Sequence, residues 1–93
     1  MSADRPEDRA FLADLGRRVR LHRLYRDLTQ QQLGERAGLS RNFVSLFEKG
    51  RHGIDVMALR RLAQALAVPL PTLVAESGEG VLPWAPSPEG AAR

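Results

Sequence analysis

Residues 29–50 read TQQQLGERAGLSRNFVSLFEKG, and this stretch decides how the chain folds. It opens on Thr29 and carries Gln32 three residues later, which is the pattern of a capping box at the start of a helix. Gly38 stands where the left-handed conformation of glycine can end that helix. The pattern therefore predicts a short helix over residues 30–37, closed by a glycine turn.

A second short helix follows this turn almost at once. Ser40 can act as its N-cap and Gly50 stands directly after it, so we expect a helix over residues 41–49. Two helices joined so tightly must cross closely, and Gly34 falls where the crossing leaves no room for a larger side chain. The apolar contacts that would lock the second helix across the first are Leu33, Ala37, Leu39, Val44 and Phe47. These features together predict a helix-turn-helix; a plain pair of packed helices that binds nothing is the alternative.

The flanking sequence predicts three more helices, which makes the fold all-α with five helices. Apolar residues recur at helical spacing over residues 7–26, on a stripe made of Phe11, Leu15, Val19 and His22. Asp55 can cap a fourth helix over residues 56–67, whose buried side would carry Val56, Leu59, Leu62, Ala63 and Leu66. A proline at its first position suits a short fifth helix over residues 71–75.

The charge distribution divides the chain into three parts. We expect a flexible N-terminus over residues 1–8, a domain over residues 9–75, and a Pro/Gly-rich tail over residues 76–93 that holds a lone Trp84. The middle part has twelve basic and five acidic residues, a net charge of +7, whereas each end has a net charge of −2. A basic body suits a polyanionic partner, although a merely solvated surface would show the same charge.

Several classes of chemistry are poorly supported. The chain has no cysteine, and His22 and His52 are its only histidines, so we expect no metal site and no cofactor. His22 is interpreted as a neutral, hydrogen-bonded residue at the edge of the core. No nucleophile stands with a base, so we expect no enzyme. No apolar run approaches the length of a membrane span, which predicts a cytoplasmic protein without a membrane partner.

The run over residues 28–74 resembles the Cro/phage-repressor (Xre) helix-turn-helix family, and with the first helix the resemblance covers about residues 15–75. It implies a compact, five-helix, lambda-repressor-like DNA-binding domain. It also implies a homodimer that binds an inverted-repeat operator in double-stranded DNA. The stretch SRNFVSLFEKG is similar to the small controller proteins of restriction–modification systems. The length of 93 residues leads us to expect a regulator that acts without a ligand-binding or protease-like domain.

The resemblance implies a role for individual residues in the helix over 41–49, which would lie in the major groove. The residues at base edges would be Arg41, Asn42, Ser45 and Leu46. Arginine can bind guanine and asparagine can bind adenine through two hydrogen bonds each. Leu46 departs from the polar residue common in the family; it would either pack on a thymine methyl or contact nothing specific. The residues at the phosphate backbone would be Gln30, Phe43, Arg51 and His52, with Gln30 also bracing the reading helix.

Glu48 needs an explanation, because a carboxylate beside DNA repels phosphate. The resemblance pairs it with Arg23 of the first helix, which makes the pair structural. Apolar residues near the fifth helix exceed what one small core needs, and we expect a dimer interface at Leu70, Leu73 and Val74.

Two other functions stay open at this point. One is an antitoxin that binds DNA and masks a toxin with its tail, in which Trp84 would be the masking element. The other is a protein-interaction module that no longer binds DNA, against which Arg41, Asn42 and the basic middle part argue. Contact with a toxin or with RNA polymerase is left open, as are the operator sequence, the regulated gene and the sign of regulation.

Overall fold

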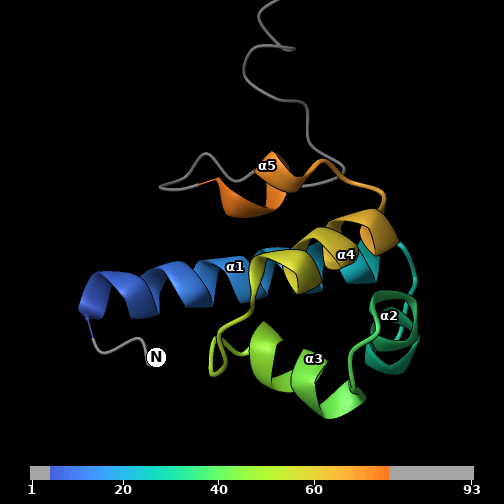
Figure 1. Ribbon diagram of the computed structural model, residues 1–93, viewed down its shortest axis with the longest axis horizontal. Coiled ribbons are helices and arrows are strands. Elements are labelled where there is room, and N and C mark those ends of the chain that lie inside the picture. Colours follow the sequence, from blue (N-terminus) through green and yellow to red (C-terminus); the bar gives the residue numbers. More distant parts are fainter. Residues whose placement is uncertain (1–4, 76–93) are drawn as a thin grey trace, which may run out of the picture.

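The structure, a computed structural model, describes residues 5–75 and contains five helices in that range (Figure 1). They are α1 (Pro6–Tyr25), α2 (Gln30–Ala37), α3 (Arg41–Glu48), α4 (Val56–Leu66) and α5 (Leu70–Val74). The same residues contain no strand, and the all-α class with five helices expected from the sequence is confirmed.

The first helix begins earlier than the expected domain boundary. Pro6 stands in the first turn of α1, with Glu7 and Asp8 behind it, so the helix runs through the end of the segment for which flexibility was expected. A proline has no N–H to leave unpaired there, and acidic side chains favour the positive end of the helix dipole. The Arg5 guanidinium donates to Glu7 at 2.6 Å and lowers the pKa of that carboxyl.

The capping residues of α2 and α3 act as their spacing predicts. The Thr29 hydroxyl accepts from the Gln32 N–H at 3.0 Å, and the Thr29 N–H donates to the Gln32 side chain at 2.9 Å. Gly38 ends α2 with φ 70°, and the Ser40 hydroxyl accepts from the Phe43 N–H at 3.0 Å. These local hydrogen bonds fix where both helices begin, so the boundaries expected for α2 are confirmed.

The small residue at the crossing of α2 and α3 is required by geometry. A Cβ added to Gly34 would lie 2.4 Å from the Leu39 carbonyl oxygen, which is backbone and cannot swing aside. Any larger residue would therefore push the turn that leads into α3 away from α2.

The five helices enclose one core. In Figure 1, α5 lies on one side of α1 and α4, and α2 and α3 lie on the other. The buried apolar residues come from all five helices and from the turn before α2: Leu15, Val19, Leu28, Leu33, Ala37, Val44, Phe47, Leu59, Leu62, Ala63, Leu66 and Leu73. Val56 was expected on the buried side of α4 but is 66% exposed. It is the first residue of that helix, and its side chain lies beyond the edge of the core.

Three arginines join the helices through backbone carbonyls at helix ends. The last carbonyls of a helix lack partners within the helix, and a guanidinium can satisfy them while its charge matches the negative end of the dipole. Arg18 donates to the Leu73 carbonyl of α5 at 3.0 Å, Arg26 to the Leu66 carbonyl of α4 at 3.0 Å, and Arg61 to the Ala37 carbonyl of α2 at 2.8 Å. Part of the arginine content of the chain therefore serves the fold.

The backbones of α1 and α3 approach each other closely at Gly16. A Cβ added there would lie 2.2 Å from the Phe47 carbonyl oxygen and 2.8 Å from the Glu48 carbonyl oxygen. The absence of a side chain at Gly16 lets the C-terminal end of α3 rest directly on α1.

We expect Gly16→Ala to lower the free energy of unfolding by about 1–3 kcal/mol, because the added methyl group must displace the α3 backbone. The gain of roughly 1 kcal/mol in helix propensity is too small to compensate. Urea unfolding followed by circular dichroism measures the change. Gly53→Ala is the matched control, since a Cβ at Gly53 meets nothing within 4 Å. If Gly16→Ala is as stable as the control, α1 and α3 do not approach as closely at Gly16 as described.

Candidate nucleic-acid interface

The outer face of α3 carries polar and basic side chains that reach solvent. Val44, Phe47 and Glu48 face the core, which leaves the opposite side of this helix to the residues expected to read bases. Arg41 and Asn42 are exposed, and Ser45 and Leu46 are partly exposed. The structure thus brings the four expected residues together on one surface.

The buried side of α3 ends in an ion pair with α1. Arg23 Nε lies 2.6 Å from Glu48 Oε2, and Arg23 Nη2 donates to Glu48 Oε1 at 3.0 Å. The Arg23 side chain is 9% exposed and the Glu48 side chain 2%. Arg23 Nη1 also donates to the Leu28 carbonyl at 2.8 Å, just before α2 begins. The pair that the family resemblance suggested is therefore present, and it joins three segments.

Gln30 completes this network from the first turn of α2. Its side-chain Nε2 donates to Glu48 Oε1 at 3.1 Å, so the Glu48 carboxylate accepts from both Arg23 and Gln30. Gln30 is half-buried. The start of α2 is thereby held against the end of α3.

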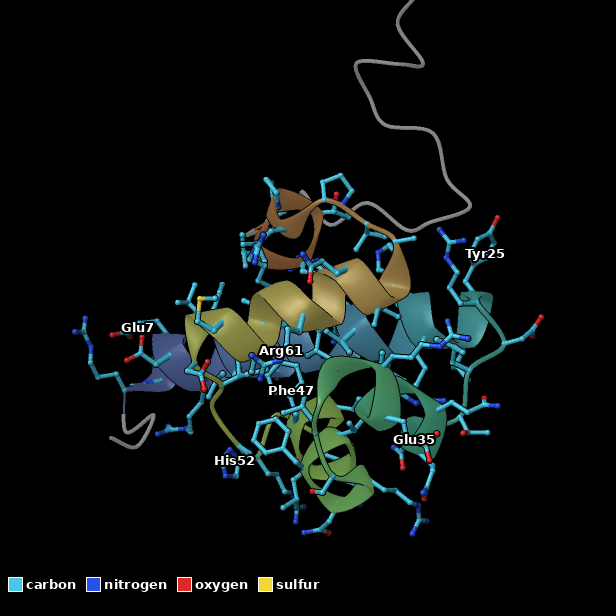
Figure 2. The ribbon with its side chains drawn as sticks, turned by 45° about the vertical axis from the view of Figure 1, so that its right-hand side comes forward. Glu7, Tyr25, Glu35, Phe47, His52 and Arg61 are labelled. Carbon is cyan, nitrogen blue, oxygen red and sulfur yellow. The ribbon has the colours of Figure 1, made fainter. Side chains whose placement is uncertain are left out.

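The loop between α3 and α4 forms the other flank of α3. Figure 2 shows His52 of this loop and Glu35 of α2 on opposite sides of α3. Arg51 and His52 are exposed, and the His52 ring meets the Phe43 ring edge-on with centroids 4.7 Å apart. Phe43 is half-buried, because its other neighbour is the core residue Phe47 at 6.2 Å between centroids.

An open groove of about 870 Å³ separates this loop from the start of α1. Its lining includes Arg9, Phe43, Arg51, His52 and Asp55. The Asp55 carboxylate accepts from the Ala58 N–H at 2.8 Å as the N-cap of α4, and it places a negative charge beside the basic residues of the loop.

The charges on the outer surface of α3 have one sign. The helix contains a single acidic residue, Glu48, and that carboxylate is buried against Arg23. The exposed charges that the helix and its C-cap carry are Arg41 and Lys49. A helix with this face can approach a polyanion without desolvating an acid of its own.

The structure removes one residue, Leu73, from the expected dimer surface. Leu73 is 0% exposed and belongs to the core of its own chain, because α5 turns it towards α1 and α4. Leu70 and Val74 are half-buried and keep part of their apolar surface in solvent. Trp84 and the rest of the tail over residues 76–93 lie outside the described residues.

The described residues were also compared with what a metal site and a membrane-spanning helix require. Among residues 5–75, no group of three histidine or carboxylate side chains is arranged to hold a metal ion. No helix in that part of the chain has the length and apolarity to cross a membrane.

The fold and the exposed polar face of α3 define a DNA-binding helix-turn-helix domain. The sequence pattern of the family described as "Helix-turn-helix domain" matches residues 14–77. The chain belongs to this helix-turn-helix family, and the relatives that it matches include proteins named as transcriptional regulators.

Individual relatives support the same class. The immunity repressor protein of Bacillus phage phi105 is 36% identical over 62 residues, which are 67% of this chain and 43% of the repressor. The chain thus spans less than half of that relative's length. Among solved structures, the restriction-modification controller protein C.AhdI from Aeromonas hydrophila matches with a TM-score of 0.67 and 31% identity, over 69% of this chain and 97% of the controller. The P22 c2 repressor, solved in complex with a synthetic operator, matches with a TM-score of 0.64 and 25% identity, over 68% of this chain and 96% of that one.

We expect Glu48→Ala and Arg23→Ala each to lower the free energy of unfolding by about 3–5 kcal/mol without any DNA present, because each variant leaves a buried charge without its partner. Thermal unfolding measures the effect. Asp14→Ala is the control, since it breaks the exposed pair that Asp14 forms with Arg17, and such pairs contribute about 0–1 kcal/mol. Melting of all three variants at the wild-type temperature would show that the Arg23–Glu48 pair does not hold α3 in place.

Proposed function

We propose that the chain regulates transcription by binding an inverted-repeat operator in double-stranded DNA as a homodimer, with α3 in the major groove. The observation that carries this proposal is the exposed face of α3, where Arg41 and Asn42 reach solvent while the one acid of the helix is buried. Selection of bound duplexes from a random DNA pool tests it. Recovery of an inverted repeat is the expected result, and an unenriched pool would contradict it.

The base contacts follow from the chemistry of four side chains. Arg41, in the first turn of α3, can bind guanine O6 and N7, and Asn42 can bind adenine N6 and N7. Ser45 and Leu46 lie one turn further along the helix, where a hydroxyl can reach a base edge and a leucine can pack on a thymine methyl.

The phosphate contacts come from both flanks of α3. Gln30 lies at the start of α2, and Arg51 and His52 lie in the loop that follows α3. Phe43 holds the His52 ring and would touch the sugar-phosphate backbone only through its exposed edge. Contacts of this kind fix the orientation of a protein on DNA and carry no sequence information directly.

A two-fold dimer would double these contacts. One reading helix covers only a few base pairs, and two copies related by symmetry can read half-sites about 34 Å apart. We place the interface at Leu70 and Val74, the two half-buried apolar residues of α5.

The particular kind of regulation that we propose is that of a restriction–modification controller. The similarity to C.AhdI, which extends over 97% of that controller, supports this choice. It is tested by asking whether the selected operator lies upstream of restriction–modification genes.

Substitution of two arginines separates base reading from phosphate binding. We expect Arg41→Ala to cost about 1–3 kcal/mol on the selected operator and to flatten the preference at one base pair in each half-site. Arg51→Ala should weaken binding to all duplexes about equally and reduce the salt slope by about one unit per site. Titrations of operator and scrambled duplexes over a range of salt concentrations measure both effects. An equal loss on both duplexes for Arg41→Ala would make Arg41 a phosphate contact.

The dimer is tested by analytical ultracentrifugation. We expect the wild-type chain to sediment as a dimer at tens of micromolar, and Leu70→Glu combined with Val74→Glu to sediment as a monomer, because buried charges oppose association. Val56→Glu is the control, since Val56 is exposed on α4 and lies outside the proposed interface. A wild-type chain that is monomeric throughout this range contradicts the proposal.

A further inference from the structure

The Glu48 carboxylate has a second neighbour besides its ion-pair partner, and that neighbour is a proposed phosphate contact. Glu48 Oε1 accepts from Arg23 Nη2 at 3.0 Å and from Gln30 Nε2 at 3.1 Å. Gln30 is the first residue of α2, and it is only half-buried. The Gln30 amide therefore faces Glu48 through Nε2, while its remaining polar groups can face a ligand.

The chemistry of a carboxylate decides how this amide is turned. An ionised carboxylate can only accept hydrogen bonds, whereas a glutamine amide has an accepting oxygen and an NH₂ group with two donors. The Gln30 oxygen facing Glu48 would place two acceptors together, so the NH₂ group must face it instead. One N–H is then used by Glu48, and the second N–H of the same nitrogen is available for another acceptor.

Arg23 cannot make this second contact itself. Its guanidinium is buried, and it donates to both oxygens of Glu48 and to the Leu28 carbonyl. The ion pair therefore presents no net positive charge to a phosphate at this end of α2. A phosphate there would need a donor that lies nearer to solvent.

We propose that Glu48 is a positioning residue for DNA binding: it turns the Gln30 amide so that the second Nε2 proton is presented to a phosphate oxygen. This inference rests on the proposed function, in which Gln30 contacts phosphate. It gives Glu48 a role in recognition beyond holding α3 on α1. The N-terminal end of α2 adds to the contact, because the Thr29 hydroxyl takes only the Gln32 N–H and the helix dipole there attracts an anion.

A double-mutant cycle on the selected operator separates positioning from stability. Affinities are measured for the wild type, Gln30→Ala, Glu48→Gln and the double variant at a temperature where all four are folded. In the wild-type background we expect Gln30→Ala to weaken binding about 3- to 10-fold, the size of one hydrogen bond. In the Glu48→Gln background the same change should cost less than about 2-fold, because a neutral amide at position 48 can bind either orientation of Gln30.

Gln31→Ala is the matched control. The Gln31 amide donates to the exposed Glu35 at 3.3 Å and has no bond to Glu48, so its effect on affinity should be the same in both backgrounds. An equal loss for Gln30→Ala in both backgrounds, or no loss in either, overturns the inference. Absence of any preferred duplex for the wild type instead overturns the proposed function.

A second measurement needs no variant and therefore does not depend on whether Glu48→Gln folds. The two side-chain amide protons of Gln30 give separate NMR signals in the wild-type protein. Addition of the operator should shift one of them strongly, while the proton held by Glu48 stays close to its position in the free protein. If neither signal moves, Gln30 donates nothing to DNA and the inference is wrong.

Discussion

The buried pair of Arg23 and Glu48 is the interaction on which the rest of the structure depends. Removing two charges from water costs several kcal/mol each, and the attraction between them compensates only when the contacts are close and further hydrogen bonds reach both groups. Here two guanidinium–carboxylate contacts at 2.6 and 3.0 Å, together with bonds to Leu28 and Gln30, meet that condition. The pair joins α1, the start of α2 and the end of α3, so it holds the three helices against one another.

Charge in this protein is divided between structure and surface. Arg18, Arg26 and Arg61 serve carbonyls at helix ends, and Arg23 serves Glu48. Arginine suits these positions better than lysine, because its planar group donates in several fixed directions at once. The basic residues on the side of α3 lie between exposed acids, Glu35 of α2 on one flank and Asp55 at the start of α4 on the other. Arg18, Arg26 and Arg61 thus hold the helices together and still add to the basic charge of the protein.

The capped turns of the helix-turn-helix could be predicted because their causes are local. Thr29, Gln32 and Ser40 bond to amides three residues away or less, and Gly38 has a backbone conformation that few other residues adopt easily. The end of α4, expected at residue 67 and found at Leu66, has no glycine to end it. Ala67 ends that helix with φ 58°, a conformation that is unfavourable for alanine, while Arg26 of α1 bonds to the carbonyls of Leu66 and Ala67. A contact between residues forty positions apart cannot be predicted from the local sequence pattern.

The sequence by itself determined the five helices, the two capped turns and the face of α3 that carries Arg41 and Asn42, because hydrogen bonds between near neighbours and helical periodicity decide them. Only the tertiary structure decided which apolar and small residues meet. Gly16 lies directly against the backbone of α3. Leu73 belongs to the core, although its apolar side chain also suited an interface. Neither follows from spacing, since both depend on how closely helices far apart in the chain approach, and close packing leaves room for one arrangement of side chains.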